Sequence, residues 1–204
     1  MRPVRILRAA MVAALILPLA ACLGGGGATG PAAKTETGQR SAAFFRGDVI
    51  VTGPPGYCVD PKSVQRRAGS GFALMASCGH LSAAASGYVP PAVITASVLP
   101  RDPDAQMPTA VQLAGPWGDV GVTEQIDADG IALIQVARGG NTLLPAGDPR
   151  HWRGAMLVNG HMIGLAIYGD PGANLAGDAG RMLLVDTAKA MLAANPRRAP
   201  QQDG

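Results

Sequence analysis

The sequence predicts an α+β fold, an antiparallel β-sheet with a C-terminal helix packed on it. Short runs rich in β-branched residues are separated by Gly/Pro turns, and the last apolar stretch, residues 175–194, has helical spacing. Strands followed by one clear helix are typical of an α+β layer arrangement. The 204 residues include 28 glycines and 17 prolines, and only 15% are charged. This composition excludes a coiled coil or a helical bundle.

The chain opens with a targeting segment. Arg2, Arg5 and Arg8 precede a short apolar run over residues 9–19. This run is shorter than the roughly 20 apolar residues that a membrane-spanning helix needs, so it indicates a secretory signal peptide over residues 1–21. The chain has 17 basic residues, and removal of the three arginines leaves 14 against 14 acidic ones. The mature chain is therefore formally neutral, and nucleic acid is not an expected partner.

The segment ends Leu19-Ala20-Ala21-Cys22, which resembles the lipobox of bacterial lipoproteins. The resemblance implies cleavage before Cys22 and acyl chains, such as palmitate, on that residue. More than one acyl chain makes membrane anchoring stable. Leu23 rather than Asp follows the cysteine, which by the same resemblance implies the outer membrane, facing the periplasm, in preference to the inner membrane.

The residues after Cys22 predict a flexible tether. Residues 23–43 are dominated by Gly, Ala, Thr and Ser and show no apolar period, so burial cannot offset the entropy of ordering them. We expect a lipidated tether over 22–45, a single domain over 46–195 and a disordered polar tail over 196–204.

Two cysteines remain once Cys22 carries lipid. The cell envelope is oxidising, so Cys58 and Cys78 are expected to form a disulfide. A redox pair is the functional alternative, although the chain contains no Cys-x-x-Cys motif.

The elements of the first half of the domain follow from turn signals and alternation. Asp48–Thr52 is a β-rich run that ends at the Gly-Pro-Pro-Gly turn over 53–56, and extended chain resumes at 57–60. The polar stretch 62–71 reads as a short helix or loop. Further strands are predicted over 72–78, where Phe72, Leu74, Ala76 and Cys78 share one face, and over 93–99.

The second half contains two hairpin signals and the helix. The turn 127–130 lies between short strands at 120–122 and 131–136. Asn159-Gly160, the preferred type I′ pair, joins strands over 152–158 and 161–168. In the helix over 175–194, Asn174 is a candidate N-cap and Asn195-Pro196 is a stop signal. Gly177 and Gly180 weaken its first turn, so a start after residue 175 is the alternative.

Two patterns in the body carry a further resemblance. Tyr57-Cys58-Val59-Asp60 is followed by Phe72 and Cys78, and a hairpin that Trp152 begins is followed by Gly180-Arg-Met-Leu-Leu184. These patterns resemble a group of uncharacterised envelope proteins of alphaproteobacteria. The element order is also similar to the PsbP-like fold, an antiparallel sheet between helices. Neither resemblance implies catalytic residues.

The sequence contains no complete catalytic motif. Gly169-Asp-Pro-Gly resembles the nucleophile loop of trypsin-like serine proteases, but Pro171 stands where the nucleophile belongs. An envelope hydrolase, trypsin-like or another serine hydrolase with a degenerate motif, remains the alternative. Its nucleophile or acid would be Ser77, Ser82 or Asp60 beside His80.

Metal and cofactor sites are not indicated. His80, His151 and His161 have no metal-ligand spacing, and no nucleotide-binding loop occurs. Trp117, Trp152 and Tyr168 are core or edge residues, with a ligand platform as the alternative. The leading hypothesis is thus a lipid-anchored, periplasm-facing, non-catalytic binding or accessory module. Its partners would be the membrane, through the lipid on Cys22, and an envelope protein.

Overall fold

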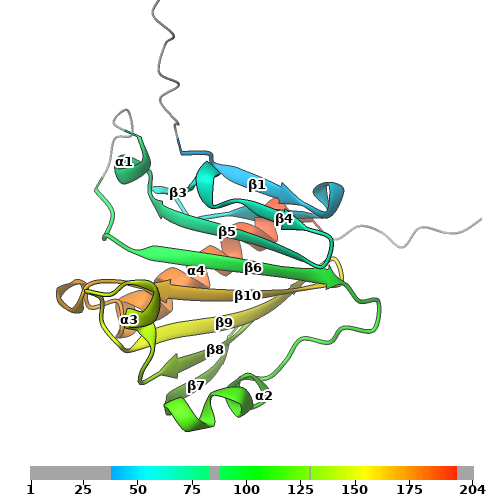
Figure 1. Ribbon diagram of the computed structural model, residues 1–204. Coiled ribbons are helices and arrows are strands. Elements are labelled where there is room, and N and C mark those ends of the chain that lie inside the picture. The colour runs from blue at the N-terminus through cyan, green and yellow to red at the C-terminus, as the bar shows by residue number, and fades with distance from the viewer. Residues whose placement is uncertain (1–37, 83–87, 129, 197–204) are drawn as a thin grey trace, which may run out of the picture. The chain divides into compact units, whose positions relative to one another are not determined.

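The computed structural model describes residues 38–82, 88–128 and 130–196 (Figure 1). Its main element is an antiparallel sheet in the strand order β3-β5-β6-β10-β9-β8-β7, and β4 also pairs with β5. Helix α4 packs on this sheet, which confirms the predicted α+β class. The strands are β3 (Tyr57–Val59), β4 (Gln65–Arg67), β5 (Ser70–Ser77), β6 (Val93–Arg101), β7 (Val122–Ala128), β8 (Ile131–Val136), β9 (His151–Val158) and β10 (His161–Tyr168).

The order of the strands in the sheet departs from their order in the sequence at one point, after β6. There the chain runs to the far edge, where β7 begins, and then returns strand by strand until β10 pairs with β6. Asn159 and Gly160 both have positive φ, 50° and 81°, as a type I′ turn between β9 and β10 requires. The predicted hairpin is therefore present. β10 lies between β6 and β9, and its side chains are nearly all apolar because most of its residues are buried.

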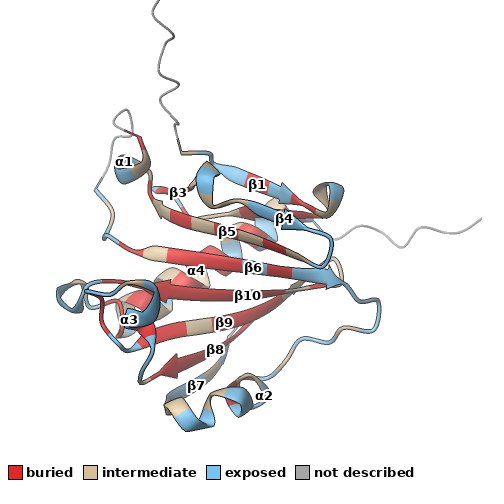
Figure 2. Cartoon of the chain, in the orientation of Figure 1, coloured by how far each residue is buried: buried red, intermediate tan, exposed pale blue. Residues whose placement is uncertain are grey.

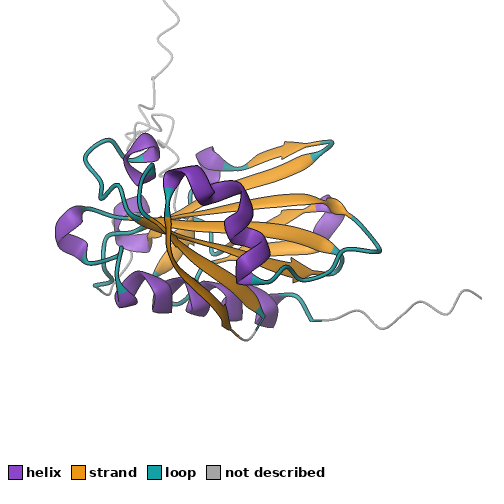
Figure 3. Cartoon of the chain, turned by 90° about the horizontal axis from the view of Figure 1, so that it is seen from below, coloured by secondary structure: helices purple, strands orange, loops and turns teal. Residues whose placement is uncertain are grey.

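One face of the sheet carries the main core. Helix α4 (Asp178–Ala194) and the hairpin of β1 (Ser41–Phe44) with β2 (Val49–Thr52) cover it. Buried residues concentrate on the central strands, as Figure 2 shows, and Figure 3 shows α4 lying along one side of them. The largest fully buried side chains include Trp152, Met156, Ile163, Leu165 and Leu184.

The opposite face is covered over only part of its width. Helix α2 (Ala110–Ala114) and the 3-10 helix η3 (Gly115–Val120) pack on β7 and β8, where they form a second small core. From β5 to β9 this side, which we call the open face, presents residues such as Phe72, Leu74, Ser97 and Gly164. On β5 the predicted alternation is present, and the buried residues are the intervening Ala73 and Met75.

The predicted boundary between tether and domain at residue 46 is too late. Strand β1 pairs with β2 from Ser41↔Thr52 to Phe44↔Val49, and the Phe44 side chain is fully buried. The 3-10 helix η1 (Phe45–Gly47) joins the two strands. Residue 46 therefore lies inside a hairpin. The run Ser-Ala-Ala-Phe is small and weakly patterned. It becomes a strand because β2 pairs with it and because the space over Gly71 of β5 accepts the Phe44 ring.

The C-terminal helix starts after residue 175, the alternative that its early glycines left open. It begins at Asp178 behind an N-cap at Gly177, and it ends at Ala194 before Asn195 as expected. Asn174 does not cap α4. Its backbone has the left-handed conformation, and it is the C-cap of the 3-10 helix η4 (Pro171–Ala173). Three further short elements complete the described chain: η2 (Pro61–Ser63), α1 (Cys78–Leu81) and α3 (Gly140–Leu143). No helix in the described segments combines the length and apolar character needed to cross a membrane.

Candidate functional site

A pocket of about 220 Å³ opens at the end of β5, β6 and β10. Its lining is mainly apolar and includes Ala76, Val93 and Leu144, which we call the floor, together with Tyr168. Ser77, His80 and Asp170 bring polar groups to its lining. We call this hollow the Tyr168 pocket. Its mixture of an apolar floor and a few polar groups is typical of small-ligand sites.

The Tyr168 pocket is bounded by short elements that follow the strands. Ser77 ends β5 and His80 lies on α1, while Leu144 follows α3. The disulfide predicted between Cys58 and Cys78 is present, with the two Cα atoms 4.9 Å apart. It ties the first residue of α1 to β3, and so holds the wall that carries His80 against the sheet.

The hydrolase candidates are only partly brought together. Ser77 and His80 line the same pocket, but within the described residues no hydrogen bond joins them. Asp60 caps η2, where its carboxylate accepts a hydrogen bond from the Lys62 N–H at 2.9 Å. Among the described residues no hydrogen bond or ion pair joins Asp60 to His80. Ser82 directly follows α1, is buried, and is not among the pocket residues.

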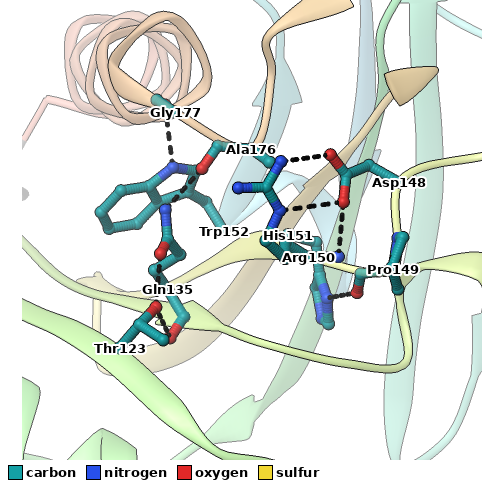
Figure 4. Close-up of polar contacts among 9 residues, drawn as sticks. All are labelled: Thr123, Gln135, Asp148, Pro149, Arg150, His151, Trp152, Ala176 and Gly177. Carbon is teal, nitrogen blue, oxygen red and sulfur yellow. Dashed lines mark hydrogen bonds and ion pairs between the residues drawn. The ribbon is translucent and has the colours of Figure 1, made fainter. Parts of the chain in front are cut away.

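Tyr168 connects the pocket to a buried histidine. Its ring stacks on the His151 imidazole, with centroids 5.1 Å apart and planes at 18°, and Trp117 meets that imidazole edge-on at 6.5 Å. His151 Nδ1 lies 3.4 Å from the Pro149 carbonyl oxygen (Figure 4). In the described structure its Nε2 is buried and has no partner. Burial lowers the pKa of His151, so the imidazole is neutral at neutral pH.

Arg153 lies on the open face of β9, two residues after His151. Its guanidinium carbon is 4.0 Å from the centroid of the Trp117 ring, a cation–π contact. No carboxylate among the described residues forms an ion pair with it. Burial lowers the pKa of Arg153, and the neighbouring Tyr168 hydroxyl opposes that effect. The arginine is therefore a half-buried cation without a neutralising charge, an arrangement typical of anion-binding positions.

A second arginine nearby is neutralised. Arg150 pairs with Asp148 at 2.8 Å, and its guanidinium lowers the pKa of that carboxyl (Figure 4). The Asp148 N–H donates to the Gly169 carbonyl at 2.9 Å, which ties this turn to the pocket end of β10. The Asp148–Arg150 pair thus shapes the turn before β9 and leaves no free charge for a ligand.

Trp152 and Gln135 are structural. The indole N–H of Trp152 donates to the Gly177 carbonyl at 3.0 Å, and the Gln135 amide donates to the Ala176 carbonyl and accepts from the Thr123 hydroxyl (Figure 4). These contacts attach the residues before α4 to the main core. Of the three aromatic residues considered as a ligand platform, Trp152 is fully buried, whereas Trp117 and Tyr168 flank the site.

The histidines do not form a metal centre in the described part of the chain. His161, which directly follows the β9–β10 turn, is buried, with its Nδ1 2.8 Å from the Leu99 carbonyl oxygen and its ring stacked on Phe45. It lies at the opposite end of β10 from Tyr168. No group of three His, Cys, Asp or Glu side chains in the described residues is placed to hold a metal ion.

Sequence reasoning did not single out Arg153. The available signal was a lone charged residue inside the otherwise apolar run 152–158. The expectations for Cys22, the lipobox and most of the tether fall on residues 1–37, which lie outside the described residues. Comparison of the chain with protein-family models, with curated proteins and with solved structures finds no significant match.

Proposed function

We propose that this chain is a lipid-anchored envelope protein whose folded body is a non-catalytic binding module, and that the Tyr168 pocket is its ligand site. The observation that carries the proposal is the pocket itself, a hollow of about 220 Å³ with an apolar floor. The anchor rests on the resemblance of Leu19-Ala20-Ala21-Cys22 to a lipobox. Anchoring would keep the module at the membrane surface, facing the periplasm.

The make-up of the pocket supports binding over chemistry. Apolar surface that a ligand covers contributes about 25 cal/mol per Å², so a small apolar group gains affinity from this floor. Catalysis by a serine needs a nucleophile within hydrogen-bond reach of its base, and Ser77 and His80 are not joined in that way in the described structure. The polar residues are therefore suited to orienting a ligand.

The pocket is tested by NMR titration with hexanamide, a neutral amphipathic probe. We expect chemical-shift changes at Ala76, Val93 and Tyr168 that saturate with concentration. Ala76→Leu fills the floor and should abolish them, whereas Ala193→Leu, on the exposed side of α4, should leave them unchanged. Absence of saturable changes, or equal changes in Ala76→Leu, contradicts the proposed site.

The anchor is tested by fractionation. Wild-type cells should hold the protein in the membrane fraction and incorporate a clickable palmitate analogue. Cys22→Ala should abolish the label and the membrane attachment, whereas replacing Cys58 and Cys78 together should abolish neither. Tight membrane attachment of an unlabelled Cys22→Ala protein refutes the lipid anchor.

A further inference from the structure

We propose that the ligand of the Tyr168 pocket is a small amphipathic carboxylate, whose apolar part fills the pocket and whose carboxylate pairs with Arg153. This inference rests on the proposed function and names the ligand class of the same site. It is carried by three observations: the position of Arg153 beside the pocket, its unneutralised charge, and the position of Asp170 at the other end of the site.

Arg153 is a diagonal neighbour of Tyr168 on the open face. In the β9–β10 register Arg153 stands opposite Ala166, which is two residues before Tyr168 on the same side of β10. Such diagonal neighbours are about 7–8 Å apart in an antiparallel pair. Tyr168 also lines the pocket, and its hydroxyl lies beside the guanidinium. One short molecule can therefore contact both the pocket floor and Arg153.

Apart from Tyr168 itself, the strand residues between the pocket and Arg153 are small. The row that contains Arg153 continues through Ala166 to Thr95 on β6, by the pairings Arg153↔Ala166 and Ala166↔Thr95. Both are small residues, and the next row along β10 is formed by Gly164. A Cβ built at Gly164 meets nothing within 4 Å. Small residues alone define no site, but Ala166 and Thr95 leave room for a ligand between the pocket and the guanidinium, and Gly164 leaves the far side of the Arg153 row open.

The chemistry of Arg153 favours a carboxylate. A guanidinium presents a planar fork of N–H donors that matches two carboxylate oxygens, and the Trp117 ring holds one of its faces. Its charge has no acidic partner in the described residues, so an incoming anion replaces water and displaces no existing ion pair. Arg66 offers the contrast, because it lies over the Phe44 ring at 5.4 Å but remains exposed on the edge strand β4.

Asp170 sets the direction of the ligand. It lies at the pocket two residues beyond Tyr168 along the chain, whereas Ala166, which faces Arg153, lies two residues before it. A ligand carboxylate is repelled at the Asp170 end and attracted at the Arg153 end. The volume of about 220 Å³ is below the 300–1,000 Å³ typical of drug-sized ligands. The apolar part is therefore a short acyl chain or a single apolar side chain.

The test compares hexanoate with hexanamide, which have the same chain and differ in charge. NMR titration of the wild-type protein should show hexanoate binding about tenfold more tightly than hexanamide or better, as a charge-assisted pair provides. Hexanoate should also change the fluorescence of Trp117. Arg153→Gln should remove the preference and leave hexanamide binding intact. Arg66→Gln is the matched control and should retain the preference for hexanoate. Arg153→Lys should retain only part of that preference.

The outcomes separate this inference from the proposed function. Equal affinity for the two probes in the wild-type protein, with both blocked by Ala76→Leu, overturns the carboxylate assignment and leaves the binding site standing. A preference for hexanoate that survives in Arg153→Gln also overturns it. If neither probe shifts the pocket resonances, both proposals fail. The comparison of probes on the wild-type protein does not depend on whether any variant folds.

Discussion

Tyr168 and His151 stack face to face across neighbouring strands, with ring centroids 5.1 Å apart. The stack leaves the imidazole only 2% exposed, and in the described structure its Nε2 has no hydrogen-bond partner. A proton on this ring would place a second positive charge near Arg153 in a poorly solvated position. The folded state therefore favours the neutral imidazole.

This preference predicts acid sensitivity. Burial lowers the pKa of His151 below its ordinary 6.5, so between those two pKa values the unfolded chain binds a proton that the folded chain does not. The free energy of unfolding should therefore fall as the pH drops from 6.5 toward the folded-state pKa. The total loss is about 1.4 kcal/mol for each unit by which the folded-state pKa lies below the unfolded-state pKa. Urea unfolding at pH 7.5, 6.0 and 5.0 should show a flatter dependence in His151→Phe. His80→Gln, at an exposed histidine, should keep the wild-type slope, and an unchanged slope in His151→Phe contradicts the prediction.

The disulfide should be a permanent stabilising link. Cys58 and Cys78 are 20 residues apart in sequence, and closing such a loop stabilises a fold by about 3 kcal/mol in the chain-entropy model. Replacing both cysteines with alanine should lower the free energy of unfolding by about that amount. Mass mapping of the native, unreduced protein should find the bridge intact. Two free thiols in that sample would favour the redox alternative.

A glycine in α4 is predicted to be intolerant of substitution. Alanine in place of glycine normally stabilises a helix by up to about 1 kcal/mol. At Gly180, however, a Cβ would lie 1.8 Å from the Leu175 carbonyl oxygen, so the backbone before the helix must move. Gly180→Ala should therefore lower the melting temperature, with a loss of about 2 kcal/mol or more.

Gly172 provides the matched control, because a Cβ there meets nothing within 4 Å. Gly172→Ala should change the melting temperature little. Equal melting temperatures for Gly180→Ala and the wild type would contradict the close contact between the Leu175 carbonyl and Gly180.

The hydrolase alternative makes a separate prediction at Ser77. Activity-based labelling with a fluorophosphonate should give no serine adduct on the purified protein, because in the described structure no hydrogen bond from His80 activates this hydroxyl. Ser77→Ala serves as the control for background labelling. A wild-type adduct that disappears in both Ser77→Ala and His80→Ala would establish the hydrolase and overturn the non-catalytic module.

The parts of the fold set by local chemistry could be predicted from the sequence. Asn159-Gly160 specifies its turn because both residues tolerate positive φ, and Asn195-Pro196 marks the end of the last helix. The role of Asn195 could not be read in this way. Its amide exchanges two hydrogen bonds of 2.7 Å with the backbone of Ile50, 145 residues away, and so ties α4 to β2.

The candidate site was less predictable for the same reason. Strand alternation places Arg153 on the side of β9 away from Trp152, but it does not reveal that Trp117, from a separate connection, covers the guanidinium. Tyr168 likewise became part of a site only when β10 paired with both β6 and β9. These contacts depend on sheet order, which periodicity along one strand does not contain.

The first described residues determine how the fold bears tension. A pull on the chain from its N-terminal side reaches the body at Gly38, which packs closely against Cys58. Gln39 exchanges two backbone hydrogen bonds with Val59, at 2.9 and 2.7 Å, and the disulfide passes the load from β3 to the residue that follows β5. The strand that receives the load through these hydrogen bonds is thus covalently joined to the residue after β5, so β3 cannot be peeled away alone while the bridge is intact.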